Sequence, residues 1–348
     1  SAWLGGMSLL GVLCFRYPSW LTTAALRSNY DVDLLRTMLR VTLWTSLAFG
    51  LMTFVRDKRK RMGAIGVLCT VAAFALGGWQ VQAAGVQDHA VTVGVDWMLL
   101  DFLLSGLVFI FIEKLFPRYE AQIVLRPEWR LDLVYFIINH LLISVLLLVG
   151  NHVAPAVFGW AVNHSVQTAV RSLPLPLQVI LLMFCADFVQ YWIHRAYHEV
   201  PALWKLHAVH HSAEHMDWLA GSRNHTLQIL IDRSLAMVPL YLLGPDKAAL
   251  DAYVVVVGFQ TVFIHANVGW SFGFLNRLIV TPQFHHWHHS SDKPAIDTNY
   301  AVHLPVLDML FGTYHLPDAH WPIAYGTVTR LPRTLWAQLA YPFKPGAK

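Results

Sequence analysis

HRAYHEVPALWKLHAVHH, at residues 194–211, gathers five histidines into one short stretch of the chain. It contains HxxxH at its start and HxxHH at its end, and a second HxxHH recurs within HHWHH at residues 285–289. On a helix, residues three or four positions apart lie on one face, where their side chains can share a metal ion. At this chain's histidine frequency, one HxxHH is expected by chance only about 0.06 times. The spacing therefore predicts a metal site built from three segments.

Eight histidines of these clusters are the predicted metal ligands. Imidazole is the commonest metal-binding side chain and suits iron, zinc and copper. One ion takes roughly four to six ligands, so eight imidazoles predict a centre with two metals. The eight are His194, His198, His207, His210, His211, His285, His288 and His289.

Three further histidines lie near these motifs or in comparable positions. His265 is a lone histidine near the end of a long apolar segment, and we predict that it is a ninth ligand. His225 stands where the chain enters another apolar segment, so it is either a ligand, a residue that supports a ligand, or a helix cap. His286 points away from the helical face that the other histidines of its cluster share, and we predict no metal contact for it.

Four polar residues are predicted to support the ligands. Asp187 shares a helical face with the first histidine cluster, and an acidic residue within a membrane segment is usually functional. We expect it to hold a ligand imidazole in the correct tautomer; the alternative is a structural hydrogen bond between helices. Glu199 is a ligand, a supporting residue or a surface charge. Asn267 and Asp297 complete the predicted supporting set.

The composition is typical of a membrane protein. Hydrophobic residues make up 56% of the chain and charged residues 13%, against about 25% charged residues in soluble domains. Because lipid offers the backbone no hydrogen-bond partners, apolar segments of about 20 residues should be helices. We therefore predict an all-α, multi-pass transmembrane helical bundle with a helical cytosolic cap that carries the dimetal site. The predicted spans are 38–55, 63–84, 97–116, 133–153, 177–193, 226–243 and 248–268.

The position of basic residues predicts the orientation in the membrane. Five of the six residues from Arg56 to Arg61 are Lys or Arg, and they directly follow the first of these spans. The positive-inside rule assigns this loop to the cytoplasm, and counting spans forward brings all three histidine clusters to the same side. We interpret the basic run as this topology signal and predict no nucleic-acid partner. The expected location is a bacterial inner membrane or the endoplasmic reticulum, with the metal site facing the cytoplasm.

Two long stretches resemble the fatty acid hydroxylase (sterol desaturase-like) superfamily of integral-membrane di-iron enzymes. They are DFVQYWIHRAYHEVPALWKLHAVHHS at 187–212 and TPQFHHWHHSSD at 281–292. Two short segments that follow them, DTNY at 297–300 and FGTY at 311–314, also resemble the family. The text is most similar to the alkylglycerol monooxygenase-like and bacterial sterol-desaturase-like branch. The resemblance implies two irons bound by the eight histidines, with His265 as an additional ligand. The distribution of reactive side chains predicts a division into N-terminal transmembrane helices without a recognised motif (1–130), a fatty acid hydroxylase-like membrane and catalytic core (131–320) and an irregular C-terminal tail (321–348).

The resemblance further implies an O2-dependent oxidoreductase. We expect it to hydroxylate an unactivated C–H bond of a lipid: a membrane lipid, a fatty acyl chain, an ether lipid or a sterol-like molecule. The two electrons would come from an external donor, either a pterin or a cytochrome- or ferredoxin-type protein. A desaturase acting on the same lipids is the nearest alternative. A zinc hydrolase and a metal transporter are two further alternatives. Zinc sites typically need only three or four ligands, fewer than the eight histidines here. A transporter would spread its ligands over several mid-membrane segments, whereas these histidines cluster on one side.

Overall fold

The computed structural model describes residues 1–23, 27, 30–56, 60–82, 92–142, 152–317 and 320–344. Every regular element within these ranges is a helix, and none of them is a strand, which confirms the predicted all-α fold. Among the described residues, five helices are long and apolar enough to cross a membrane, so the chain is an integral membrane protein. They are Val32–Arg56, Lys60–Gln80, Val95–Leu115, Leu175–Glu199 and Thr226–Leu243.

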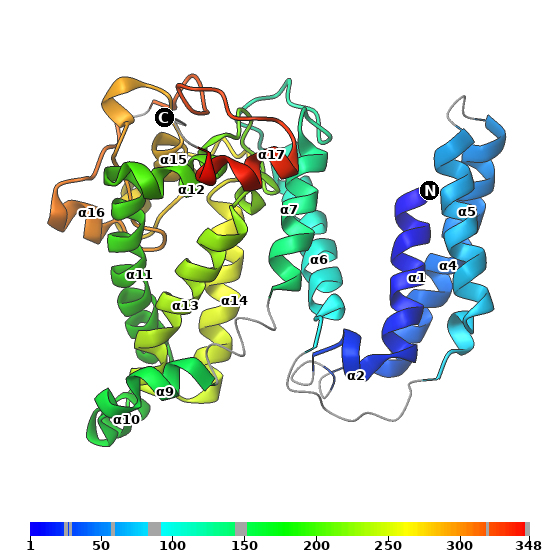
Figure 1. Cartoon of the computed structure of the whole chain (residues 1–348), viewed down its shortest axis with the longest axis horizontal. Coiled ribbons are helices and arrows are strands. Elements are labelled where there is room, and N and C mark those ends of the chain that lie inside the picture. Colours follow the sequence, from blue (N-terminus) through cyan, green and yellow to red (C-terminus); the bar gives the residue numbers. More distant parts are fainter. Residues whose placement is uncertain are drawn as a thin grey trace. The chain divides into compact units, whose positions relative to one another are not determined.

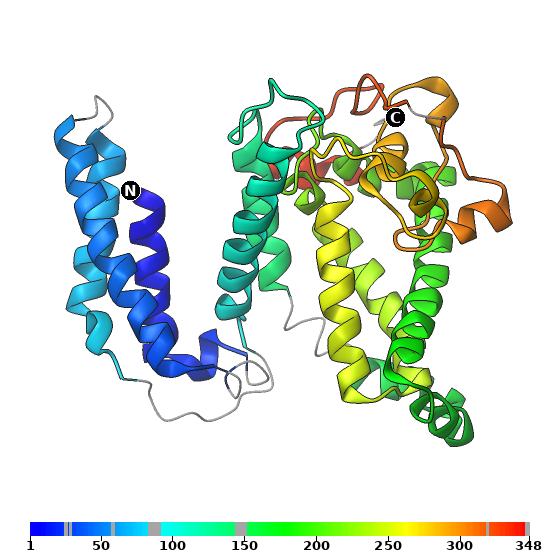
Figure 2. The same cartoon turned by 180° about the vertical axis from the view of Figure 1, so that it is seen from behind.

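The chain divides into two compact units, and the first comprises Ser1–Leu103 with His140–Val145. Its helices are α1 (Ala2–Arg16), α2 (Pro18–Leu21), α4 (Val32–Arg56), α5 (Lys60–Ala75), η1 (Gly78–Gln80) and the start of α6 (Val95–Leu115). Helices α1, α4 and α5 lie side by side in both Figure 1 and Figure 2. A Cβ added to Gly5 of α1 would stand only 2.5 Å from the carbonyl oxygen of Gly66 on α5. Such close backbone contact is how helices associate in lipid, where burial of apolar surface gives little gain.

The second unit comprises Leu104–Asn139 and Leu146–Lys348 and contains all the histidine motifs. At its centre α11 lies against α13 and α14 (Figure 1), and Leu182, Leu240 and Tyr253 from these three helices share a buried apolar core. Helix α7 (Trp129–Leu141) belongs to this unit except for its last two residues. The helices that belong to it in full are α9 (Ala154–Phe158), η3 (Gly159–Ala161), α10 (His164–Arg171), α11 (Leu175–Glu199), α12 (Pro201–His211), η4 (Ala220–Ser222), α13 (Thr226–Leu243), α14 (Lys247–Phe263), η5 (Gly273–Arg277), α15 (Pro282–His288), η6 (Lys293–Ala295), α16 (Val306–Phe311), α17 (Leu335–Ala340) and η7 (Tyr341–Phe343).

The short helices α12 and α15 lie at the end of α11, and local sequence explains where they begin. Val200 is extended (φ −103°, ψ 111°), as a residue before proline should be, so α11 ends there and Pro201 opens α12. Thr281 caps α15 by accepting a hydrogen bond from the main-chain N–H of Phe284, and Pro282 occupies its first turn. Figure 1 shows both helices gathered at one end of the long bundle, as the predicted cap requires.

Two of the predicted spans differ from the helices of the structure. In place of a span at 133–153, α7 begins earlier at Trp129 and ends at Leu141, while residues 143–151 lie outside the described part of the chain. In place of a span at 248–268, α14 ends at Phe263. The five residues that follow leave the helix and carry His265 toward the other histidines. The C-terminal segment predicted to be irregular contains α17.

Candidate metal centre

The structure brings nine histidines together in two groups. In each group, one nitrogen from every member lies within 4.8 Å of the others. The five-histidine group consists of His194, His198, His207, His211 and His288, and the four-histidine group of His210, His265, His285 and His289. These are the eight predicted ligands together with the predicted ninth, His265.

The two HxxHH motifs are divided between the groups in opposite ways. In α12 the first and last histidines of the motif enter the five-histidine group, and the middle one enters the four-histidine group. In α15 the first and last enter the four-histidine group, and the middle one enters the five-histidine group. The HxxxH of α11 supplies two more members to the five-histidine group. Each short helix therefore serves both groups, which explains why the motif occurs twice.

The protonation of the four-histidine group shows that it fits a cation. His210 Nδ1 lies 3.0 Å from the carbonyl oxygen of Arg223, and His265 Nδ1 lies 2.9 Å from that of Thr261. A carbonyl only accepts, so each Nδ1 must carry the single proton of a neutral imidazole. The two Nε2 atoms then face each other with lone pairs, 3.3 Å apart. A metal ion between them removes the repulsion that this arrangement otherwise creates.

The five-histidine group follows the same rule. His194 Nδ1 lies 2.6 Å from the carbonyl oxygen of Tyr300, and His288 Nδ1 lies 2.9 Å from that of Thr298. These contacts leave each Nε2 unprotonated, and that of His288 is buried without a protein partner. Metal-bound histidines typically donate their other N–H to a carbonyl or a carboxylate, so both rings are oriented as metal ligands are.

Spacing between the ring nitrogens also fits shared ions. A metal–nitrogen bond of about 2.1 Å places two ligand nitrogens at right angles about 3.0 Å apart. Four Nε2 pairs have separations close to this value: His194–His207 at 2.9 Å, His207–His211 at 3.0 Å, His265–His285 at 3.0 Å and His285–His289 at 3.1 Å. Both groups therefore have the geometry of a metal site.

Burial keeps these imidazoles in the form that binds metals. Desolvation, and to a smaller extent the neighbouring imidazoles, hold the pKa of His207 and His211 well below the usual value of histidine. A lowered pKa means that the ring loses its proton at a lower pH, so both side chains are neutral near pH 7. Neutral imidazole is the species that coordinates a metal.

Residues 179–313, which contain both groups, match the Fatty acid hydroxylase family. The chain contains a fatty acid hydroxylase domain. This confirms the resemblance drawn from the two quoted stretches, and the relatives below confirm the branch. No solved structure matches the chain.

Three curated relatives illustrate the family. An ornithine lipid hydroxylase from Rhizobium tropici is 35% identical over 170 residues, which are 49% of this chain and 51% of that protein. The alkylglycerol monooxygenase of Homo sapiens is 35% identical over 143 residues, 40% of this chain and 31% of that protein. A methylsterol monooxygenase of Arabidopsis thaliana is 25% identical over 257 residues, 70% of this chain and 93% of that protein. The alignments thus span about half or less of the first two relatives.

Asp187 of the fatty acid hydroxylase domain requires a correction. Its buried carboxylate accepts hydrogen bonds from the main-chain N–H groups of Val302, His303 and Leu304, at 2.8, 3.1 and 2.6 Å. The predicted bond to a ligand imidazole is replaced by these three contacts. Asp187 therefore acts on the site indirectly. It anchors the segment just after Tyr300, and the carbonyl of Tyr300 orients His194.

For His225 and Glu199 the structure favours the non-ligand alternatives. His225 caps α13: its Nδ1 accepts from the N–H of Leu227 at 3.2 Å, and its Nε2 donates to the carbonyl of Leu339 at 3.1 Å. Glu199 forms an exposed ion pair with Arg195, at 2.7 Å. Neither belongs to the two histidine groups.

The last two supporting candidates differ from each other. Asp297 Oδ1 lies 3.1 Å from His198 Nδ1, so it contacts a member of the five-histidine group as predicted. Asn267 instead pairs its side chain with both main-chain groups of Tyr119, at 2.9 and 3.2 Å. It fixes the backbone two residues after His265, and this is a correction to its predicted role.

Sequence reasoning missed the groups that orient four of the nine histidines. The carbonyls of Arg223, Thr261, Thr298 and Tyr300 each receive an imidazole N–H. Every residue has a carbonyl, so no sequence signal distinguishes these four. Gly221 is the kind of neighbour that a sequence can reveal, because glycine is recognisable. A Cβ at this position would lie 2.7 Å from His265 Nδ1, so the close contact requires glycine.

Neighbouring histidines in α15 give a matched pair of variants. We expect His285→Gln to remove about half of the bound metal, because the four-histidine group loses a central ligand. His286→Gln should leave the metal content unchanged, since His286 Nδ1 pairs with the Tyr325 hydroxyl at 2.9 Å outside both groups. Elemental analysis of protein purified in mild detergent measures both. Equal metal loss in the two variants would contradict the assignment.

Proposed function

We propose that the chain is an O2-dependent di-iron monooxygenase that hydroxylates an unactivated C–H bond of a membrane lipid. The observation that carries the proposal is the pair of histidine groups whose unprotonated Nε2 atoms converge within a fatty acid hydroxylase domain. The names of the relatives support the substrate class, since they act on an ornithine lipid, on alkylglycerols and on methylsterols.

The two groups would each hold one iron. Bound iron would supply the redox chemistry that reduces O2 and attacks the C–H bond. The overall balance is that the lipid, O2, two electrons and two protons give the lipid alcohol and one water. The protein contributes neutral imidazoles, whose orientation is fixed by carbonyls, and an interior from which water is excluded. Because these imidazoles are neutral, they would leave the positive charge of a bound metal pair uncompensated.

The position of the groups along α11 supports a particular region of the lipid. Residues 175–193 of α11 are largely apolar and would cross about 28 Å at 1.5 Å per residue, close to the thickness of the hydrocarbon core. His194 and His198 occupy the last turns of the same helix. The reaction would therefore take place near one membrane surface, and the oxidised carbon would lie close to the polar end of the lipid. On the charge pattern of the loop after α4, this surface is the cytoplasmic one.

A cleft supports access for the external reductant. It has a volume of about 670 Å³ and is lined in part by Ser212 and Ser291, which closely follow the two HxxHH motifs. Clefts of about 300–1,000 Å³ are typical of small-molecule sites, so a pterin-sized reductant fits here. A cytochrome- or ferredoxin-type donor would instead dock at the mouth of this cleft.

Isotope labelling tests the proposal. Protein loaded with iron, given membrane lipids, a reductant and 18O2, should yield lipid that carries one 18O atom near the headgroup. Tandem mass spectrometry gives the position of the label, and chelator-treated protein is the control. Lipid without 18O, from protein that contains two irons per chain, would contradict the monooxygenase proposal. One stoichiometric zinc in place of iron would favour hydrolysis.

A further inference from the structure

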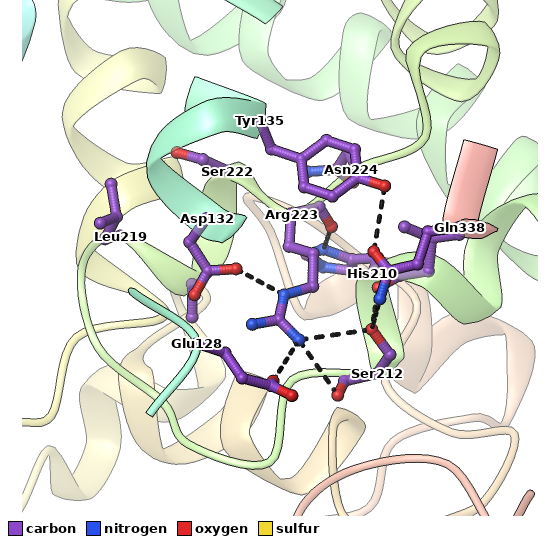
Figure 3. A network of polar contacts seen from close by, with 12 residues as sticks. Glu128, Asp132, Tyr135, His210, Ser212, Leu219, Ser222, Arg223, Asn224 and Gln338 are labelled. Atoms are coloured by element: carbon purple, nitrogen blue, oxygen red, sulfur yellow. Dashed lines mark hydrogen bonds and ion pairs between the residues drawn. The ribbon is translucent and has the colours of Figure 1, made fainter. Parts of the chain in front are cut away.

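A buried network of charged side chains adjoins the four-histidine group. Arg223 is only 1% exposed, and its Nε lies 2.5 Å from Asp132 while its Nη1 lies 2.8 Å from Glu128. Figure 3 shows these contacts, with the side chain of His210 beside the main chain of the same arginine. The same Nη1 lies 3.3 Å from the carbonyl of Ser212.

A second arginine extends the network. Arg126 is also 1% exposed, and its Nε and Nη2 donate to the carboxylate of Asp217 at 2.8 and 2.7 Å. Its Nη2 lies 2.6 Å from the second oxygen of Asp132. Asp132, which is fully buried, therefore bridges the two arginines. Four charged side chains are thus paired within the interior, close to the start of α7.

Such a network is an expensive way to stabilise a fold. Removing charges from water carries a large free-energy cost, and well-packed apolar side chains often stabilise a protein equally well. We therefore look for the contribution of the network in the backbone positions that it fixes. A guanidinium group donates in fixed directions, so its paired contacts add geometric specificity to the backbone around them.

The backbone that the network fixes is the loop 217–223. Asp217 accepts hydrogen bonds from the main-chain N–H groups of Leu219 and Ala220, at 3.1 and 2.8 Å. Asn139 donates to the carbonyl of Ser222 at 2.9 Å. The side chain of Arg223 secures the end of the loop. Each end of the segment is thus tied to a buried ion pair.

This loop forms a wall of the four-histidine group. The carbonyl of Arg223 orients His210, and Gly221 packs so closely against His265 that a Cβ would meet its Nδ1 at 2.7 Å. The corresponding carbonyls for the five-histidine group come from a different segment, at Thr298 and Tyr300. The carbonyls that orient the two groups therefore come from separate segments, although α12 and α15 supply ligands to both.

We propose that Arg223, together with Asp132 and Arg126, is a positioning residue for the four-histidine group and controls the metal affinity of that group alone. The inference rests on the proposed function only in that both groups hold a metal. The network sets where His210 and His265 stand by fixing the loop 217–223. Substitutions behind metal ligands typically weaken binding by about 10- to 100-fold. We expect an effect of that size on one of the two metals.

The test measures metal binding rather than turnover. Arg223→Lys keeps the positive charge but loses the planar guanidinium group that contacts two carboxylates at once. Anaerobic titration with Fe2+ should then show one of the two metals, that of the four-histidine group, bound at least about tenfold more weakly than in the wild type. The same substitution in the His285→Gln background should leave the affinity of the remaining metal unchanged, because that metal occupies the five-histidine group. Asp297→Asn, which removes the carboxylate behind His198, is the matched control and should weaken that remaining metal.

Each outcome decides the inference. Wild-type affinity for both metals in Arg223→Lys overturns it, and so does equal weakening of the remaining metal in the His285→Gln background. If Arg223→Lys does not fold, Arg126→Lys replaces it, because it removes the paired contacts of Arg126 with Asp217 while the Arg223 side chain stays in place. Loss of one metal in that variant supports the inference, and full metal content overturns it. A wild-type chain that binds fewer than two metals would instead count against the proposed function.

Discussion

His207→Ala is expected to abolish lipid oxidation and to remove the metal of the five-histidine group. His207 is central to that group, because its Nε2 lies 2.9 Å from that of His194 and 3.0 Å from that of His211. Substitutions behind the ligands already weaken metal binding by about 10- to 100-fold, so loss of a ligand should cost at least as much. Metal content and 18O incorporation measure the two effects.

A structural histidine provides the control for this variant. His225→Asn keeps a side chain that can cap α13, and His225 lies outside both groups, so metal content and activity should stay at wild-type levels. If the His207 variant kept two metals and full activity, the five-histidine group would not be a metal site. Loss of metal in both variants would point to a general effect on folding.

Asp187→Ala is expected to have the largest effect on stability. The substitution leaves three main-chain N–H groups without an acceptor: that of His303, which is buried, and those of Val302 and Leu304, which are partly buried. An unpaired buried group costs about 1–3 kcal/mol, so the loss is a sizeable share of the stability of many domains, about 5–15 kcal/mol. The segment after Tyr300 should then lose its position, and His194 its orientation. A lower temperature of thermal unfolding in detergent, together with metal loss, is the expected result.

Two variants make the Asp187 prediction specific. Asp187→Asn retains one acceptor oxygen at the same place and should have an intermediate unfolding temperature. Glu199→Gln breaks only an exposed ion pair, worth at most about 1 kcal/mol, and should unfold as the wild type does. An Asp187→Ala protein with the unfolding temperature of the wild type would contradict the anchoring role.

The histidine spacing predicted the membership of the site but not its division. Helical periodicity is a local property, so residues 194–211 sufficed to show that their histidines share faces. Which metal each would contact depends on how α12 and α15 pack, and that packing joins residues far apart in the sequence. The same limit explains Asp187. Its helical face was predicted correctly, yet its partners are main-chain groups more than a hundred residues away.

Helix ends show a second limit. The end of α13 carries a local signal, because Gly244 adopts the left-handed conformation (φ 51°) that glycine favours after a helix, and Pro245 follows it. Hydropathy extended the next span to residue 268, whereas α14 ends at Phe263. The apolar character of Ile264, Ala266 and Val268 reflects burial beside the metal groups rather than a continuing helix. Apolar residues serve both environments, so composition alone does not separate them.

The opposite sharing of α12 and α15 between the two groups restricts how this domain can evolve in length. One residue inserted or deleted between the histidines of either helix rotates the later ones by about 100°, which would move ligands out of both groups in a single step. The loops outside these helices carry no such penalty. Related sequences should therefore vary in length between the motifs and keep the internal count of each HxxHH unchanged.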